Sequence, residues 1–465
     1  MTDKRATHST KNGSSGADGC RRPTPGFVAG IVAVVCMTNA SAVEFAQEIA
    51  SVTSESEQVR HGASAPAINV WGDRVVFESV DPDFDDVGDY VSHIFLRDRA
   101  EGQTVLLSNG KEGPGNAGSY APDIDFEGEH VVFESLATNL TCAGCDQNDA
   151  MDVFLFDLRT REIIRLSQPS RQDADGPSFD AHVASGGNRV VFTSWATNLV
   201  RGDTNRTGDV YLWDRYKGLK RISLTPSGRQ FVGLSHSPDI SDNGRHVVFV
   251  NDTGSGSSRI YRYDVDSGVT EDISDLSPLT ESGQNVEPSV SSTGEFIAWA
   301  TTGYRGRRAQ DRSIAFRVVV RQMVSDVQCV FYCVETYPHT ALLNDEPGEQ
   351  RGPQVFGTVG GNKIYHLWFW ARPNVGVAYT SRDSGRRHVM LQYDDGAGND
   401  THLVQLSSNS FGEAVNGNSS QPAIGVDFYS INRWRVAFVT NATNLDPFDD
   451  NGSAPDVIVA ERIDR

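Results

Sequence analysis

Aspartate and asparagine side chains recur at one spacing in three places along the chain. The three sets are Asp83, Asp85 and Asp89; Asp146, Asn148 and Asp152; and Asp203, Asn205 and Asp209. Oxygen ligands at positions 1, 3 and 7 of a short loop suit a hard cation such as Ca²⁺. The spacing therefore predicts calcium sites, with the set that begins at Asp203 as the best of them.

A second interpretation of these loops needs no metal. A helix–loop–helix calcium site also has a ligand at position 5 and a bidentate Glu at position 12, and the loops lack both. Asp and Asn side chains also form Asx turns, in which they accept a hydrogen bond from a nearby backbone N–H. The last Asp of each set would then only open the next strand, and the sequence leaves both interpretations open.

Four of the cysteines fall in two close pairs, Cys142 with Cys145 and Cys329 with Cys333. In an exported protein, close pairs predict local disulfides. Free thiols, or a zinc or redox site, are the alternatives. A redox pair needs a helix N-terminus to lower the pKa of its thiol, and Cys142 and Cys145 stand in an acidic loop instead.

The charge of the chain narrows the classes of partner. Lys and Arg number 41 against 61 Asp and Glu, which gives a net charge of −20. Nucleic acids and anionic membranes are bound by basic surfaces, so both are excluded as partners. The chain carries no sequence signature of a serine hydrolase, a zinc peptidase or a phosphate-binding loop. The sequence therefore names no catalytic residue, and Ca²⁺ is the one cofactor that it suggests.

The loops connect short strands that repeat along the chain. Residues 122–133 are PDIDFEGEHVVF, residues 238–249 are PDISDNGRHVVF, and residues 66–77, 181–192 and 288–299 keep the same frame. Each copy predicts a strand, a turn that contains glycine and a second strand that ends in an aromatic residue. Seven such aromatic residues follow one another: Phe77, Phe133, Phe192, Phe249, Trp299, Tyr379 and Phe438.

Each unit continues with a third strand that ends in Asp and a fourth strand that ends in Ser. Four strands in roughly 57 residues, repeated in tandem, indicate the blades of a β-propeller. The sequence predicts an all-β propeller of seven four-stranded blades, or of six if the unit of Tyr379 belongs to its neighbour. The last unit lacks a fourth strand, and we expect Glu48–Thr53 to supply it and close the ring.

The first 42 residues differ from the rest of the chain. Arg21 and Arg22 precede the apolar run Gly26–Met37, and small residues follow at Ala40–Ala42. This pattern predicts a secretory signal peptide over residues 1–42, and a disordered tail is the alternative. The apolar run is too short to span a bilayer. We therefore expect a propeller over residues 45–465 that is a monomer, secreted or periplasmic, with no membrane-spanning segment in the mature chain.

The repeated phrase resembles that of TolB-type, WD-repeat-like bacterial propellers. Residues 239–245 (DISDNGR) are the nearest copy, and the Ala-Thr-Asn-Leu runs at 137–140, 196–199 and 442–445 are similar to those of exported bacterial propellers. The resemblance covers about residues 45–465. It implies the propeller fold and carries little information about activity.

Two functions from different classes fit these observations. We expect an exported, non-enzymatic binding or scaffold protein that acts through loops at one rim of the ring, on a protein or glycan partner that the sequence does not name. The alternative is a hydrolase or lyase that acts on extracellular glycans in the central channel. Convergent His, Arg and carboxylate side chains in that channel would favour the enzyme.

Overall fold

The computed structural model describes residues 44–463 except for 85–89, 143, 170–171, 255, 275–282, 303–316, 324–339, 343–348, 359–373, 384–385, 395–400, 409–414, 427–433 and 446–450. The predicted signal peptide lies outside the described residues.

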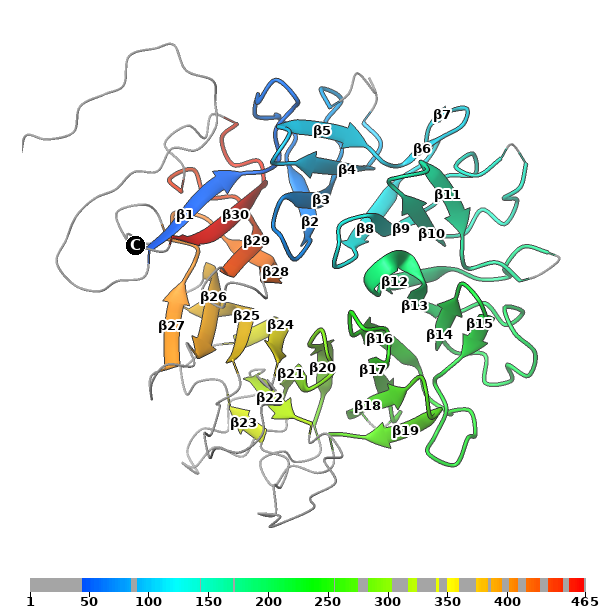
Figure 1. The fold of residues 1–465 in the computed structure, drawn as a ribbon. Helices are drawn as coiled ribbons and strands as arrows, with labels where there is room; N and C mark the ends of the chain where they lie inside the picture. The colour runs from blue at the N-terminus through cyan, green and yellow to red at the C-terminus, as the bar shows by residue number, and fades with distance from the viewer. Residues whose placement is uncertain are drawn as a thin grey trace, which may run out of the picture. The chain divides into compact units, whose positions relative to one another are not determined.

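Seven four-stranded antiparallel sheets follow one another around a ring (Figure 1). Blades 1 to 3 are β2 (Ala63–Ile68), β3 (Arg74–Ser79), β4 (His93–Asp98) and β5 (Gln103–Leu106); β8 (Ser119–Ile124), β9 (His130–Ser135), β10 (Asp152–Asp157) and β11 (Glu162–Arg165); and β12 (Ser178–Val183), β13 (Arg189–Ser194), β14 (Asp209–Asp214) and β15 (Gly218–Arg221). Blades 4 and 5 are β16 (Ser235–Ile240), β17 (His246–Asp252), β18 (Ser258–Asp264) and β19 (Val269–Asp272); and β20 (Asn285–Val290), β21 (Phe296–Thr301), β22 (Arg317–Gln322) and β23 (Thr340–Leu342).

Blades 6 and 7 complete the ring. They are β24 (Glu349–Thr358), β25 (Asn374–Asp383), β26 (Arg386–Asp394) and β27 (Thr401–Gln405); and β28 (Ser419–Val426), β29 (Trp434–Thr440), β30 (Asp456–Ile463) and β1 (Glu44–Ile49). A small hairpin of β6 (Asn109–Gly110) and β7 (Gly113–Pro114) and a 3-10 turn, η1 (Ser185–Gly187), lie between strands. Tyr379 lies on β25 in a blade of its own, so the prediction of seven blades is confirmed and the alternative of six is wrong.

The ring closes through β1, which pairs antiparallel with β30 over its whole length. The predicted closing strand is therefore confirmed, but its predicted bounds are wrong, because the pairing ends at Ile49 and not at Thr53. Ser51 explains this end. Its hydroxyl accepts the backbone N–H of Val457 at 3.1 Å and donates to the carboxylate of Asp456 at 3.3 Å. Serines end the fourth strands of blades 2 and 3 in the same way.

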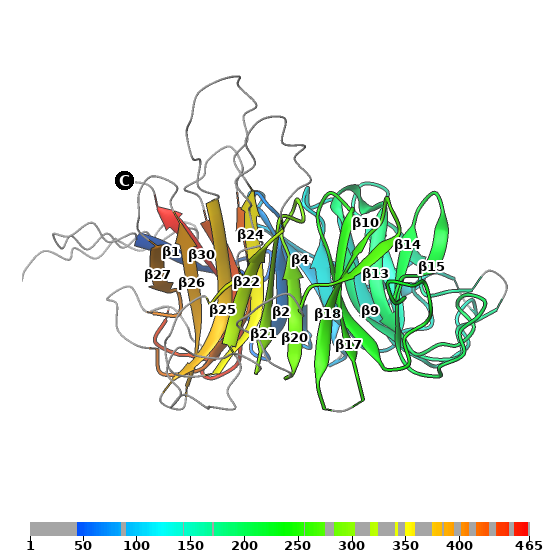
Figure 2. The same ribbon diagram turned by 90° about the horizontal axis from the view of Figure 1, so that it is seen from below.

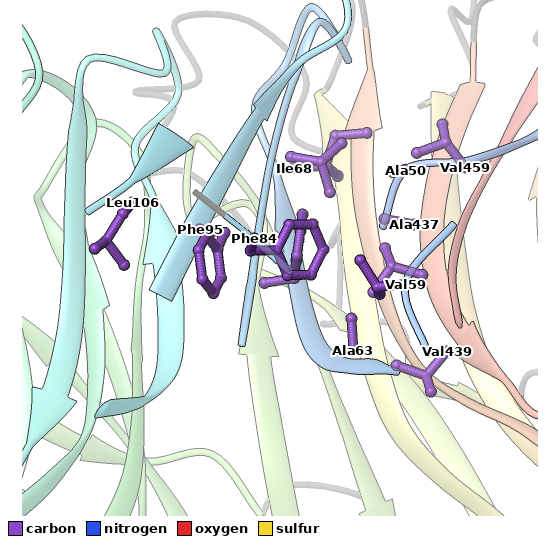
Figure 3. Close-up of a cluster of buried hydrophobic side chains, with 13 residues drawn as sticks. Ala50, Val59, Ala63, Ile68, Phe84, Phe95, Leu106, Ala437, Val439 and Val459 are labelled. Atoms are coloured by element: carbon purple, nitrogen blue, oxygen red, sulfur yellow. The ribbon is translucent and has the colours of Figure 1, made fainter. Parts of the chain in front are cut away.

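The seven aromatic residues of the second strands are all buried completely. Phe77 stacks on Phe95 with ring centroids 6.0 Å apart and lies against Phe84 at 5.5 Å. These rings meet small side chains of blade 7, including Ala437 and Val439, in a cluster between the two blades (Figure 3). Comparable clusters lie between the other neighbouring blades. One blade cannot bury both of its faces alone, so these apolar layers hold the ring together.

The glycine of the repeated phrase lies in the turn between the first and second strands. Gly128 has a φ of 77°, a conformation that favours glycine. A Cβ there would also lie 2.8 Å from Nδ2 of Asn69 in blade 1, so a side chain would collide where the blades meet. Asp125 closes this turn, because its Oδ1 accepts the backbone N–H groups of Glu129 and His130 at 2.7 and 3.0 Å.

Each innermost strand has an irregular register that suggests a β-bulge. In blade 2, Ala121 and Pro122 together lie opposite one residue of β9, and Ala121 has a φ of 45°. Proline suits this position because it has no N–H to give to the ladder. The residue at this point has a positive φ in six blades: Ala65, Ala121, Asp180, Ser237, Glu287 and Gln421.

The antiparallel strands place the connections at the two ends of the ring (Figure 2). The loops from second to third strands, and those from one blade to the next, lie at one end, which we call the loop face. The connections between first and second strands, and between third and fourth strands, begin and end at the other end of the strands, the turn face. The predicted acidic loops belong to the loop face.

Candidate functional site

The innermost strands enclose a central channel with a cavity of about 370 Å³. Its titratable lining consists of the carboxylates of Asp123, Glu134, Asp180, Asp239 and Asp242 and the imidazole of His182. No Lys or Arg occurs among the described residues that line it. A channel with this charge attracts cations and repels anions.

His182 lies at the centre of this acidic group. Its Nδ1 is 3.4 Å from the carboxylate of Asp123 on β8 and 4.0 Å from that of Asp239 on β16, so it connects three blades. Withdrawal from water opposes its protonation, but the hydrogen bond to Asp123 and the charges of Asp123, Asp239 and Asp180 outweigh this and raise the pKa of His182 to about 9. The side chain is therefore a cation at neutral pH, which offsets part of the negative charge around it.

Glu134 on β9 is a second perturbed group in the channel. Its Oε1 accepts the backbone N–H of Asp180, the residue of positive φ in β12. Burial, reinforced by the charge of Asp180, raises the pKa of Glu134 to about 7, although backbone hydrogen bonds partly counter this. Burial also raises the pKa of Asp242 to about 7. Both carboxyl groups can therefore exchange protons near neutral pH.

The channel meets only part of the pattern expected for an enzyme. It combines one histidine with several carboxylates, and its described lining contains no arginine. Neither His182 nor Glu134 stands out in the sequence, because they come from different units and no local spacing links them. The available signal was position in the repeat: Glu134 directly follows the second-strand aromatic, and His182 directly follows the irregular register of its strand.

In blade 2, the structure brings Asp146 and Asp152 together around the guanidinium of Arg165. Nη1 of Arg165 lies 2.8 Å from Asp146 and 3.1 Å from Asp152, and Nη2 donates to Asp173. Asn148 donates from Nδ2 to Asp152 at 3.2 Å. The side chains of Asp146, Asp152 and Arg165 are each at most 4% exposed. The guanidinium of Arg165 thus supplies positive charge between the two carboxylates, where a bound Ca²⁺ would otherwise supply it.

Blade 3 repeats this arrangement with one change. Nη1 of Arg221 lies 3.7 Å from both Asp203 and Asp209. Nε2 of Gln230 donates to the same two carboxylates at 2.9 and 2.8 Å. Asn205 accepts the backbone N–H two residues further on at 3.2 Å, which is the geometry of an Asx turn.

The loop of blade 1 differs in its described part. Asp83 is followed by Phe84, which is buried in the core between blades 7 and 1. The third strand begins at His93, in the place that an aspartate takes in blades 2 and 3. Asp85 and Asp89 lie outside the described residues. Across the part of the chain that the structure covers, no group of three or more His, Cys, Asp or Glu is arranged to hold a metal, and Ca²⁺ binding stays a prediction.

Cys142 and Cys145 lie close together in the acidic loop of blade 2. Their Cα atoms are 5.4 Å apart, which is within the range of a disulfide. The N–H of Cys145 donates to the carbonyl of Cys142 at 3.1 Å, and Arg165 donates to the carbonyl of Cys145 at 3.0 Å. A disulfide here stays a prediction, and Cys329 and Cys333 lie outside the described residues.

The loop face carries exposed apolar side chains over blades 1 to 4. We call these residues the apolar arc: Val80 (38% exposed), Tyr90 (69%), Leu136 (38%), Trp195 (45%) and Val232 (90%). Val80, Leu136 and Trp195 each directly follow the second strand of their blade. Among the other described residues, the exposed large apolar side chains are Trp71 and Tyr216 on the turn face and Ile164, Val269 and Leu403 on fourth strands. Of the ten exposed large apolar side chains in the described part of the chain, five therefore lie on the loop face and two on the turn face.

No helix among the described residues is long and apolar enough to cross a membrane. No protein-family model and no curated protein matches the chain. Among solved structures, the chain is similar to TolB from Acinetobacter baumannii, with 19% identity over 64% of this chain and 58% of that one and a TM-score of 0.35.

Two other similar structures come from a protease and a peptidase. The propeller domain of the trilobed protease from Pyrococcus furiosus has 10% identity over 82% of this chain and 91% of that one, with a TM-score of 0.46. A puromycin-hydrolyzing peptidase from Mycobacterium tuberculosis has 12% identity over 83% of this chain and 51% of that one, with a TM-score of 0.47. These similarities concern the fold alone. The chain is a seven-bladed β-propeller, and the resemblance to TolB-type propellers expected from its repeat is also found among solved structures.

Proposed function

We propose that this chain is an exported, non-catalytic propeller that binds a protein partner through the apolar arc on its loop face. The observation that carries the proposal is the concentration of exposed apolar side chains on that face. Exposed apolar groups gathered in one region are typical of interaction sites, and Trp and Tyr are the residues that most often dominate binding energy.

Charge indicates what kind of partner would bind. The central channel is lined by carboxylates with one histidine, and the whole chain has a net charge of −20. Opposite charges speed association and disfavour wrong partners. The partner surface that fits is therefore basic, with apolar side chains that meet the arc.

Quantitative capture with matched variants tests this function. Purified protein would be incubated with the extracellular and envelope fractions of the source cells, and bound proteins would be measured by mass spectrometry. We expect Val232→Glu and Trp195→Ala to reduce capture of the partner by about 30-fold or more, the effect of losing an interface hot spot. Tyr216→Glu is the control. Tyr216 is also highly exposed (82%) but lies on the turn face, so its substitution should not change capture of the partner. Equal capture by all variants would refute the proposal.

Export is part of the proposal and rests on the sequence of the first 42 residues. A start with paired arginines, an apolar run and small residues is typical of a secreted or periplasmic protein. Cell fractionation followed by N-terminal sequencing tests it. Cleavage after Ala42 is the expected result, and full-length protein retained in the cytoplasm would contradict it.

A glycan hydrolase or lyase is the second candidate, and the channel gives it one specific observation. Glu134, with a pKa of about 7, lies beside Asp180, and enzymes that cleave glycosidic bonds use pairs of carboxyl groups with different proton affinities. Turnover in a broad glycan screen that is lost in Glu134→Gln would support this candidate over the binding function.

A further inference from the structure

A second hollow, of about 450 Å³, opens on the loop face where blades 1, 2 and 7 meet. The rings of His61, Tyr90 and Tyr120, the carboxylate of Glu78, and small residues such as Gly118 line it. Tyr90 also belongs to the apolar arc. The hollow thus combines aromatic faces with a carboxylate inside the proposed binding surface.

Two of the rings are held by neighbouring groups. The imidazole of His61 lies with Nδ1 3.2 Å from the buried carboxylate of Asp81, which also accepts the backbone N–H of His61 at 2.6 Å. Tyr90 packs edge-on against this imidazole with ring centroids 5.2 Å apart. Since Tyr90 is still 69% exposed, most of its surface remains available to a ligand.

Tyr120 lies over a glycine. A Cβ at Gly118 would be 2.1 Å from the hydroxyl of Tyr120, so only glycine allows the ring to take this position. The ring is thereby placed at the edge of the hollow, on the side of blade 2.

Glu78 supplies the negative charge. Its two oxygens accept the hydroxyl of Ser64 at 2.8 Å and the backbone N–H of Ala121 at 3.1 Å. Both donors are neutral, so neither pairs the carboxylate with a positive charge, and further lone pairs remain for a cation. Glu134 is the equivalent residue of blade 2 and also accepts a backbone N–H from the next blade, but it does not line this hollow.

We propose that this hollow binds the side chain of an arginine from the partner protein, with the guanidinium stacked on Tyr90 and ion-paired with Glu78. The inference rests on the proposed function, because it assigns one contact within the same face. A planar guanidinium stacks on aromatic rings and pairs with both oxygens of a carboxylate, which suits this lining better than a lysine ammonium does.

The test uses small probes and no partner. N-acetyl-argininamide, N-acetyl-lysinamide and N-acetyl-leucinamide would be titrated at millimolar concentration into the full chain with isotope-labelled histidine. The signal is the Hε1 resonance of His61, assigned by its loss in His61→Asn. We expect a saturable shift with the arginine probe, weaker binding of the lysine probe and no shift with the leucine probe.

Variants separate recognition from folding. Tyr90→Leu should weaken binding of the arginine probe about two- to fivefold, the size of a cation–π contact at an exposed site. Glu78→Gln should weaken it about tenfold or more, as loss of a charge-assisted hydrogen bond does. Tyr216→Leu controls for loss of an exposed tyrosine, and Glu134→Gln controls for loss of the equivalent glutamate. Neither should change binding of the probe.

Each alternative result has a definite meaning. An equal shift with lysine would overturn the assignment to arginine, and an equal shift with leucine, or no effect of Tyr90→Leu and Glu78→Gln, would overturn the site. If the arginine probe does not bind while Val232→Glu still abolishes capture of the partner, the binding function stands and the arginine contact falls.

Discussion

Replacing Arg165 by glutamine should destabilise the propeller strongly, although Arg165 lies at the end of an outer strand. The substitution leaves the carboxylates of Asp146 and Asp152 close together and buried without a cation. In the wild type, the guanidinium and one carboxylate act as two unit charges about 3 Å apart, which attract each other by roughly 5–6 kcal/mol at an effective dielectric constant of about 20. Loss of hydration offsets part of this. Removing one member of a buried ion pair typically costs about 3–5 kcal/mol, which we expect at pH 7.

The loss should depend on pH in a defined direction. Burial is the main factor that raises the pKa of Asp152 to about 6, and the hydrogen bond from Ser167 and the charge of Arg165 limit the rise. Without Arg165 this pKa rises further. A carboxyl group with a raised pKa costs stability as pH increases through that pKa, so the deficit of Arg165→Gln should shrink as pH falls from 8 to 5.

Urea denaturation followed by circular dichroism measures this effect. Arg259→Gln is the matched control, because Arg259 pairs with Asp272 at 2.8 Å but its side chain is 39% exposed. Exposed pairs contribute about 0–1 kcal/mol. A loss in Arg165→Gln no larger than that of Arg259→Gln, or one that does not change between pH 8 and 5, would refute the reasoning.

Three further predictions concern other parts of the ring. Millimolar Ca²⁺ should raise the melting temperature of Arg221→Gln, relative to chelator, by more than it raises that of the wild type. The reason is that the guanidinium of Arg221 lies beside both carboxylates of its loop and would compete with the cation. An equal effect in both proteins would show that Arg221 does not compete with Ca²⁺. In the wild type, the free energy of unfolding should fall as pH rises from 4.5 to 7, because the raised pKa of Glu134 costs up to roughly 3 kcal/mol above pH 7. Glu134→Gln should make this fall smaller. An unchanged pH profile by urea titration would contradict this. Deleting residues 1–49 removes β1 and exposes the edge of β30, so it should abolish the cooperative melt and cause aggregation in gel filtration. Deleting residues 1–43, which keeps β1, should do neither. Equal behaviour of both truncations would disprove closure by β1.

The sequence predicted the ring well because its strongest signals are local. The second-strand aromatics, such as Phe133, repeat in a fixed frame with a glycine turn before them, and all seven are buried where neighbouring blades meet. Closure was predicted from the missing fourth strand, but its end was misplaced by four residues. The serine that ends fourth strands elsewhere is Ser51 in this strand, and that signal was in the sequence.

The sites were harder to predict because they are built across units. Asp146 and Asp152 could be identified from spacing, yet the group between them, Arg165, comes from a different strand 13 residues later. His182 meets its carboxylates only because three blades converge on the axis. Three members of the apolar arc, Val80, Leu136 and Trp195, share the position directly after a second strand, but the sequence does not show that they are exposed. Tyr90 and Val232 lie elsewhere in loops of unequal length.

Site-specific photo-cross-linking tests the binding function most directly. A photoreactive phenylalanine analogue would replace Val232 on the loop face, or Tyr216 on the turn face as the control, in the native producing cells. We expect one protein with a basic surface to cross-link at position 232 and not at position 216. Cross-linking of the same proteins at both positions, or of none at position 232, would contradict a partner that binds through the loop face.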